Sequence, residues 1–124
     1  MKLHESGENY LETILLLRKK SGYVRAVDIA NSLKFSKPSV SRALAILKTA
    51  GFVEIEPSGN ILLTEAGERR AAEVYERHRV ITAFLESVLD VPSETAALDA
   101  CRIEHILSPV TFDHIRDYIK KRNL

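Results

Sequence analysis

The sequence predicts a mainly α-helical fold, in which a helix-turn-helix and a β-hairpin come first and three further helices follow. Most segments repeat apolar residues at helical spacing. A tight turn separates two short helices, the second of which opens at "SKPS", and "FVEIEPSGNILLT" contains two apolar-rich strands joined by a turn. At 124 residues the chain can form one compact domain, or a small domain with a helical extension. We place the boundary after residue 63, which gives domains 1–63 and 64–124.

The first three helices are predicted from their apolar spacing and their caps. "GENYLETILLLRKKSG" forms the first helix, with Ser6 available as the N-cap and Gly22 as the stop. The second helix runs from about Val27 to Leu33. The third opens at "SKPS", because Ser36 can cap a helix and Pro38 fits its first turn.

The hairpin and the last three helices complete the predicted fold. Two strands flank the turn Pro57–Asn60, and Thr64 caps a long helix that ends before Pro92. A further helix covers about Ser93 to Leu107. The last helix ends in two lysines, which complement the helix dipole.

Basic residues concentrate in the helix-turn-helix region. From Arg18 to Lys48 there are eight basic residues and one acidic residue, Asp28, a balance of +7. From Thr64 to the end there are nine basic and eleven acidic residues, a balance of −2. This asymmetry is typical of a front half that binds a polyanion, although solvated helix faces would give the same pattern.

The order of elements is that of a winged helix-turn-helix, whose second motif helix enters the major groove of DNA. In that helix Val40, Leu44 and Leu47 form an apolar stripe, while its first turn carries hydroxyls and cations that suit phosphates and base edges. The alternative is a helical pair that only packs, and the wing carries Glu54 and Glu56 but no basic residue. The predicted DNA-contacting residues are Arg25, Ser36, Lys37, Pro38, Ser39, Ser41 and Arg42.

The string "DACRIEHIL" places three potential ligands close together. If it is helical, Cys101, Glu104 and His105 share one face, because positions i, i+3 and i+4 are neighbours. A nucleophile with its base is disfavoured, because side chains of one helix point in parallel and no other enzyme motif occurs. The three residues are then either metal ligands or a buried thiol beside two surface groups. Other predicted helices offer further donors, namely Asn9, Glu12 and His78.

Four segments resemble the metal-dependent transcriptional repressors of the diphtheria-toxin-repressor and manganese-transport-regulator type: "ENYLETI", "SKPSVSRALAILKTAG", "YERHR" and "DACRIEHILS". The resemblance runs from about Glu8 to Tyr118, and "C-R-x-E-H-x-x-S" is its most specific element. It implies a homodimer that binds double-stranded operator DNA when loaded with Fe²⁺ or Mn²⁺ and represses metal-uptake genes. Because the chain stops at Leu124, we expect no SH3-like third domain.

The resemblance also implies a ligand set, namely Asn9, Glu12, His78, Cys101, Glu104 and His105. The last three match the core of the primary site in the iron branch. Asn9 falls where that branch has methionine and the manganese branch has aspartate, so it offers only a neutral amide oxygen. Glu12 and His78 match ligands of the second ion in the manganese branch. Since thiolate and imidazole favour later divalent ions, we expect Zn²⁺, Co²⁺ or Ni²⁺ to substitute in vitro for Fe²⁺ or Mn²⁺.

The sequence therefore predicts a repressor that is not an enzyme, that dimerises through its C-terminal helices and that controls metal-ion homeostasis genes. The alternative is a winged-helix regulator that responds to an organic ligand or to a redox signal at Cys101. A metal-dependent hydrolase and a dimerisation scaffold are more distant alternatives. No apolar run approaches the roughly 18 residues of a membrane span, and a single cysteine suits a reducing compartment. We therefore expect a cytoplasmic protein with no membrane partner.

Overall fold

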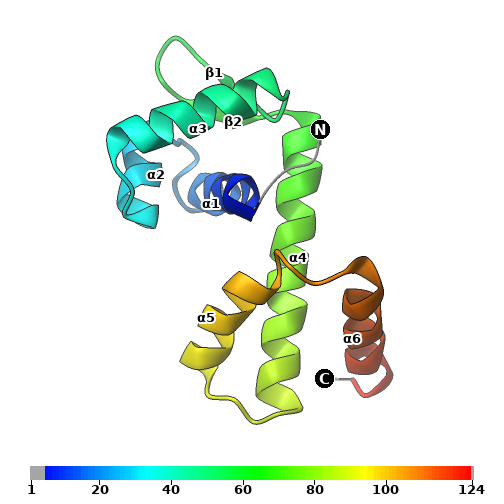
Figure 1. Cartoon of the computed structure of the whole chain (residues 1–124). Coiled ribbons are helices and arrows are strands. Elements are labelled where there is room, and N and C mark those ends of the chain that lie inside the picture. The colour runs from blue at the N-terminus through cyan, green and yellow to red at the C-terminus, as the bar shows by residue number, and fades with distance from the viewer. Residues whose placement is uncertain (1–4, 124) are drawn as a thin grey trace. The chain divides into compact units, whose positions relative to one another are not determined.

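A computed structural model describes residues 5–123, and these fold into six α-helices and a two-stranded sheet, which confirms the mainly helical prediction. In chain order the elements are α1 (Glu5–Ser21), α2 (Ala26–Leu33), α3 (Lys37–Thr49), β1 (Val53–Ile55), β2 (Ile61–Leu63), α4 (Glu65–Ser87), α5 (Ser93–Ile103) and α6 (Pro109–Lys121) (Figure 1). The outermost residues of the two predicted domains, 1–4 and 124, lie outside the described residues. The chain divides into two compact units, one ending at Ala72 and the other beginning at Glu73.

The N-terminal unit has the predicted order of helix, helix-turn-helix and hairpin. Helix α1 packs against α2, α3 and β2, and α3 packs against α2 and β1. The two strands are antiparallel, with Val53 opposite Leu63 and Ile55 opposite Ile61. The apolar stripe predicted on α3 is buried, as expected. It packs in a core whose least exposed members include Leu11, Ile14, Val24, Ile29, Val40, Leu47, Val53 and Ile61.

Several predicted caps are confirmed. Ser36 has an extended backbone (φ −71°, ψ 154°), and its hydroxyl accepts a hydrogen bond from the Ser39 backbone N–H at 3.3 Å. Thr64 caps α4 in the same way, accepting from the Gly67 N–H at 3.1 Å. Gly22 follows the last residue of α1 with φ +75°, a conformation that glycine adopts without strain.

Two predicted helix ends are wrong. Ser6 is not the N-cap of α1, because the helix already begins at Glu5 and Ser6 lies inside its first turn. Helix α5 ends at Ile103 instead of continuing to Leu107. Ser108 precedes a proline and takes an extended backbone (φ −67°, ψ 154°) as the N-cap of α6, which prevents a helix from running past Leu107. Residues 104–106 form a turn before that point, in which the Ile106 N–H donates to the Ile103 carbonyl oxygen at 3.0 Å.

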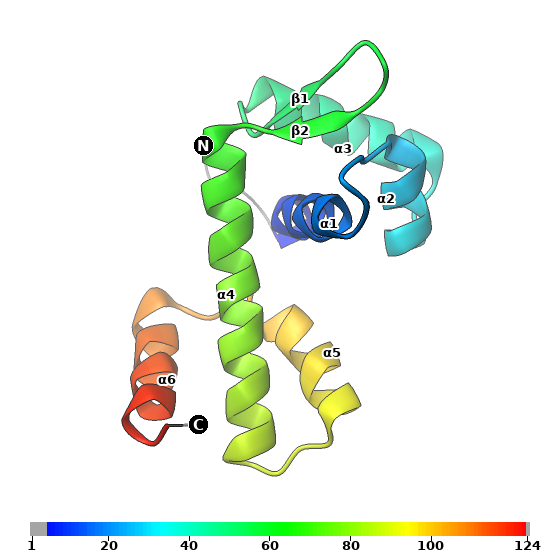
Figure 2. The same cartoon turned by 180° about the vertical axis from the view of Figure 1, so that it is seen from behind.

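The C-terminal unit is built around the second half of α4, which lies between α5 and α6 (Figures 1 and 2). One cluster in its core joins a buried residue from each of the three helices, namely Ile81, Ala100 and Phe112. Val80, Leu85, Ile103 and Leu107 pack around them. Among the helices that the structure describes, none has the length and apolar content needed to cross a bilayer.

We predict that Gly67→Ala destabilises the N-terminal unit. A Cβ atom at this position of α4 would lie 2.0 Å from the backbone oxygen of Phe52, so the helix and the hairpin would have to move apart. Overpacking of this kind costs about 1–3 kcal/mol, which outweighs the gain of about 1 kcal/mol from replacing glycine in a helix. Urea unfolding followed by circular dichroism measures the change in the free energy of unfolding.

The exposed Ala72 on the same helix provides the control. Ala72→Gly should cost only the propensity difference of about 1 kcal/mol. A Gly67→Ala variant that is more stable than the parent would contradict the close approach of α4 to Phe52.

Candidate functional site

The C-terminal unit contains a completely buried carboxylate. Glu104 follows the last residue of α5, and none of its side chain is exposed. Its Oε2 atom lies 2.9 Å from Nδ1 of His78 on α4, and its Oε1 atom lies 3.3 Å from Nε2 of His105. One carboxylate is therefore flanked by two imidazole rings, of which that of His105 is only 2% exposed. The interpretation of Glu104 and His105 as surface groups is wrong.

The neighbours of Glu104 leave one of its oxygens unsatisfied. Oε1 is buried and accepts no hydrogen bond from the residues that the structure describes. A buried polar atom in this state costs about 1–3 kcal/mol, and more when it carries charge. Buried unsatisfied atoms are rare in native proteins and commonly mark the place of an ion or a water molecule. This carboxylate oxygen therefore has the environment of a cation ligand.

The turn that carries Glu104 and His105 is held by an arginine. Nη1 of Arg77 donates to the backbone oxygens of Glu104 at 3.0 Å and of Leu107 at 3.1 Å, so it satisfies one carbonyl at the end of α5 and one just before α6. Its guanidinium also lies 5.2 Å from the centre of the Phe112 ring. Arg77 directly precedes His78 on α4, so one helix supplies both an imidazole and the residue that holds the opposite turn.

The remaining predicted ligands lie on two other helices. Cys101 is half-buried on α5, three positions before Glu104 and therefore on the same side of the helix end. Asn9 and Glu12 lie on α1 in the N-terminal unit, where Glu12 is buried with 5% exposure and Asn9 is half-buried. The structure thus gathers His78, Glu104 and His105, and the ligand roles of all six residues stay predictions.

The donor set fits a divalent transition-metal ion. Imidazole nitrogens, a carboxylate oxygen and a thiolate one turn away are ligands of Fe²⁺, Zn²⁺, Co²⁺ and Ni²⁺, and carboxylate and imidazole also suit Mn²⁺. His78 lies on α4 and Cys101 on α5, while Glu104 and His105 lie in the turn between α5 and α6 that Arg77 holds.

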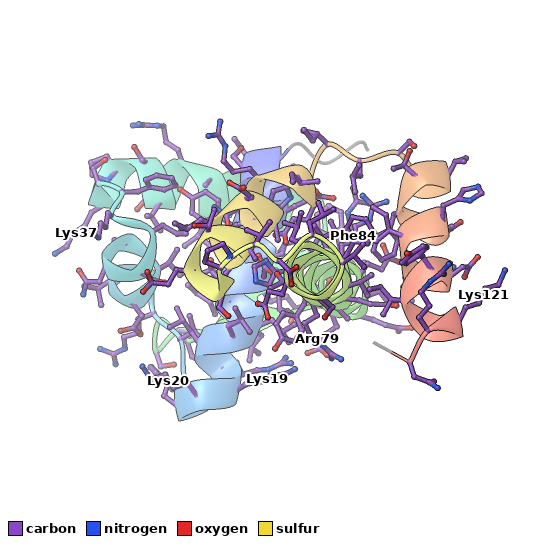
Figure 3. All side chains as sticks on the ribbon, turned by 90° about the horizontal axis from the view of Figure 1, so that it is seen from below. Lys19, Lys20, Lys37, Arg79, Phe84 and Lys121 are labelled. Carbon is purple, nitrogen blue, oxygen red and sulfur yellow. The ribbon has the colours of Figure 1, made fainter. Side chains whose placement is uncertain are left out.

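The residues predicted to contact DNA lie at the start of α3 and before α2. Ser39 is half-buried, and the others are exposed. The Ser36 and Ser39 hydroxyls form a hydrogen bond of 2.9 Å with each other. Arg42 also donates a hydrogen bond to the Ser39 hydroxyl oxygen at 3.4 Å. Lys37 projects outward at the start of the helix (Figure 3). The accessible cations are therefore Arg25, Lys37 and Arg42.

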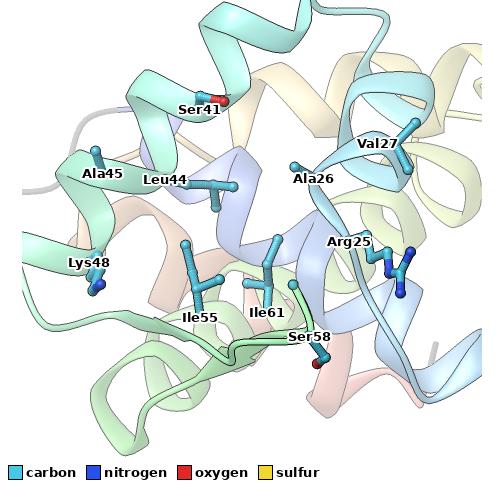
Figure 4. Close-up of a pocket in the computed structure, with 11 residues that line it drawn as sticks. Arg25, Ala26, Val27, Ser41, Leu44, Ala45, Lys48, Ile55, Ser58 and Ile61 are labelled. Carbon is cyan, nitrogen blue, oxygen red and sulfur yellow. The ribbon is translucent and has the colours of Figure 1, made fainter.

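A groove of about 640 Å³ lies between α3, the start of α2 and the wing, which we define as β1, β2 and residues 56–60. Its floor is apolar, with Leu44, Ile55 and Ile61 in the middle of the view in Figure 4. Arg25 and Lys48 lie toward opposite sides of that view. Polar groups at the rim of the groove are Arg25, Ser41, Lys48 and Ser58.

Sequence reasoning pointed to Ser58 and Asn60 as wing residues that could contact the DNA backbone, but it missed Arg77 and Lys48. Lys48 could have been found, because it lies seven positions after Ser41 and so on the same face of α3. Arg77 acts through contacts between separate elements, which spacing along the chain does not show.

Both halves of the chain match known protein families. Residues 2–61 match the family model of the iron-dependent repressor N-terminal DNA-binding domain, and residues 64–123 match that of the iron-dependent repressor metal-binding and dimerisation domain. The transcriptional regulator MntR of Escherichia coli O6:H1 is 39% identical over 114 residues, which cover 92% of this chain and 73% of MntR.

Two solved structures share the fold and span nearly all of the chain. The manganese regulator SloR has a TM-score of 0.82 at 26% identity and covers 97% of this chain. The T. acidophilum IdeR also has a TM-score of 0.82 at 26% identity and covers 100% of this chain. This chain spans 55% of the SloR chain and 56% of the IdeR chain.

We predict that Arg77→Lys weakens divalent metal binding by about 10- to 100-fold, the loss typical of residues that orient ligands. Lysine keeps the charge but lacks the planar fork that holds two carbonyls, so the turn carrying Glu104 loosens. Calorimetric titration of the metal-free protein with Co²⁺ measures the affinity.

Arg79→Lys is the matched control, because Arg79 is exposed two positions further along α4 (Figure 3). It should bind Co²⁺ like the parent. Equal affinities of the parent and Arg77→Lys would show that the arginine does not position the site.

Proposed function

The chain belongs to the family of iron-dependent repressors, and from this premise we propose that it is a metal-dependent transcriptional repressor that binds operator DNA as a homodimer. The buried Glu104 carboxylate between two imidazoles carries the proposal. The family is one of repressors and not of enzymes. The genes that this protein represses would serve metal-ion homeostasis. The protein would be located in the cytoplasm, where operator DNA lies.

The ion is proposed to be Fe²⁺ or Mn²⁺, held by His78, Glu104 and His105 with Cys101 as a further donor. Asn9 and Glu12 are proposed as additional ligands on the basis of the family resemblance. A bound divalent ion would supply the positive charge that compensates the buried negative charge of the Glu104 carboxylate. The half-buried thiol favours later ions, so Zn²⁺, Co²⁺ or Ni²⁺ should also bind in vitro.

The N-terminal unit is proposed to place α3 in the major groove. Lys37 and Arg42 are exposed at the start of that helix and can contact phosphates or base edges. Each cation that neutralises a phosphate releases counterions, so operator affinity must fall steeply with salt. Two subunits would present two α3 helices to half-sites about one DNA turn, roughly 34 Å, apart.

The proposed dimer uses an apolar surface of the C-terminal unit. Leu98 on α5, Ile106 in the following turn and Val110 on α6 are 70%, 73% and 67% exposed. Exposed apolar side chains mark a protein–protein interface when they form one contiguous patch, and we propose that these three do. The family model that matches residues 64–123 describes a dimerisation domain, which agrees with this assignment.

Metal and operator are proposed to favour the same state of the dimer. By thermodynamic linkage each must then raise the affinity of the protein for the other by the same factor. The typical coupling of 1–3 kcal/mol corresponds to about a 5- to 150-fold change in affinity.

We predict that Glu104→Gln abolishes the stimulation of operator binding by metal. The amide keeps the shape of the side chain but loses the charge that attracts a cation. The metal-free variant should be at least as stable as the metal-free parent, because a buried charge is removed. Fluorescence anisotropy with a duplex selected by the parent protein, with and without Mn²⁺ at fixed salt, measures the effect.

Thermal unfolding of the metal-free proteins is the control for folding. A Glu104→Gln variant whose operator binding still depends on Mn²⁺ with the parent's dose response would overturn the site assignment.

We predict that Ile106→Lys converts the dimer to a monomer. The substitution places a charge in the apolar surface without disturbing the core, since Ile106 is 73% exposed. Sedimentation velocity measures the oligomeric state, and Leu89→Lys, at another exposed apolar position (57%), is the control. A dimer that persists in Ile106→Lys at the parent's dissociation constant would place the interface elsewhere.

A further inference from the structure

The loop between α1 and α2 is tied to the wing by three hydrogen bonds. The Tyr23 hydroxyl donates to the backbone oxygen of Ser58 at 3.2 Å, and the Val24 N–H donates to Oδ1 of Asn60 at 3.0 Å. The Ile61 N–H in turn donates to the backbone oxygen of Val24 at 2.8 Å. The wing turn and residues 23–25 are therefore held as one element.

Arg25 is fixed within this element at both its backbone and its side chain. Its backbone N–H donates to Oδ2 of Asp28 at 2.9 Å, which caps the start of α2. Its Nε donates to the Tyr23 hydroxyl oxygen at 3.2 Å, and its guanidinium lies 5.2 Å from the centre of the Tyr23 ring. Hydrogen bonding to the Ser58 side chain and then to the Arg25 side chain lowers the pKa of the Tyr23 phenol below its ordinary value of 10.0. The phenol thus couples Arg25 to the wing turn.

The groove beside this element has the chemistry of a binding site for one strand of DNA. Arg25 and Ser58 line it together with Ser41 and Lys48 of α3, and its floor is apolar. Phosphates suit the cations and hydroxyls at the rim, while deoxyribose rings suit the apolar floor.

The acidic residues of the wing do not oppose this assignment. Ile55 lines the groove, so Glu54, its neighbour in β1, points to the opposite face of the sheet. The Glu56 carboxylate accepts a hydrogen bond from Nδ2 of Asn60 at 2.8 Å and so stabilises the wing turn.

We propose that Tyr23 is a positioning residue that holds Arg25 against the wing turn, so that Arg25 and Ser58 contact the same DNA strand in this groove. The inference rests on the proposed function and adds Tyr23 to the operator-binding surface as the residue that joins Arg25 to the wing. It predicts that the Tyr23 hydroxyl contributes to DNA affinity only through Arg25.

The test is a double-mutant cycle with Tyr23→Phe and Arg25→Ala in the full chain, loaded with Mn²⁺ and titrated against a duplex selected by the parent protein. Tyr23→Phe should weaken binding about three- to tenfold, the scale of one lost phosphate contact. Arg25→Ala should weaken it at least as much and reduce the slope of log Kd against log salt by about one. Tyr23→Phe should add nothing in the Arg25→Ala background.

Two controls separate positioning from a general effect on folding. Tyr118→Phe removes a hydroxyl from α6 and should leave DNA affinity unchanged. Ultraviolet titration of the phenols should show a component below pH 10.0 that Tyr23→Phe removes and that Arg25→Ala moves toward the ordinary value.

Unchanged affinity and salt slope in Tyr23→Phe, or additive losses in the double variant, would overturn the inference alone. A parent protein that selects no duplex under any metal condition would overturn the proposed function and this inference together.

Discussion

The buried charge of Glu104 is the constraint on which the C-terminal unit depends. A carboxylate with no exposed surface loses its hydration and needs compensation from its surroundings. Two imidazoles approach it, but Oε1 accepts no hydrogen bond from the described residues. An apolar residue of similar volume would commonly be as stable or more stable at such a position. The unit therefore gives up stability at the place where a cation would restore it.

The geometry around this carboxylate follows from a short stretch of sequence. The turn after α5 carries Glu104 and His105, and Ser108 before a proline starts α6 shortly after it. Arg77 donates to two carbonyls of that turn and stacks on Phe112, so all three helices of the unit hold the site. A turn that is held by packed helices keeps its side chains in place better than a free loop would.

Local patterns were sufficient to predict much of this structure. Caps such as Ser36 and Thr64, together with the apolar spacing of α3, locate most helices, because these signals depend on neighbours in the chain. The proximity of Glu104 and His105 also follows from spacing. The burial of Glu104 and the role of Arg77 could not be predicted, since both arise from packing between α4 and the turn after α5. The domain boundary after residue 63 stays a prediction, and so do the ligand roles of all six proposed metal ligands.

The location of the ion tests the central claim most directly. Crystals of the chain grown with Mn²⁺ and measured near the manganese absorption edge would give an anomalous difference map. The account predicts a peak within bonding distance of Oε1 of Glu104 and of a ring nitrogen of His105. An anomalous peak elsewhere, with Oε1 of Glu104 touching no ion, would contradict it.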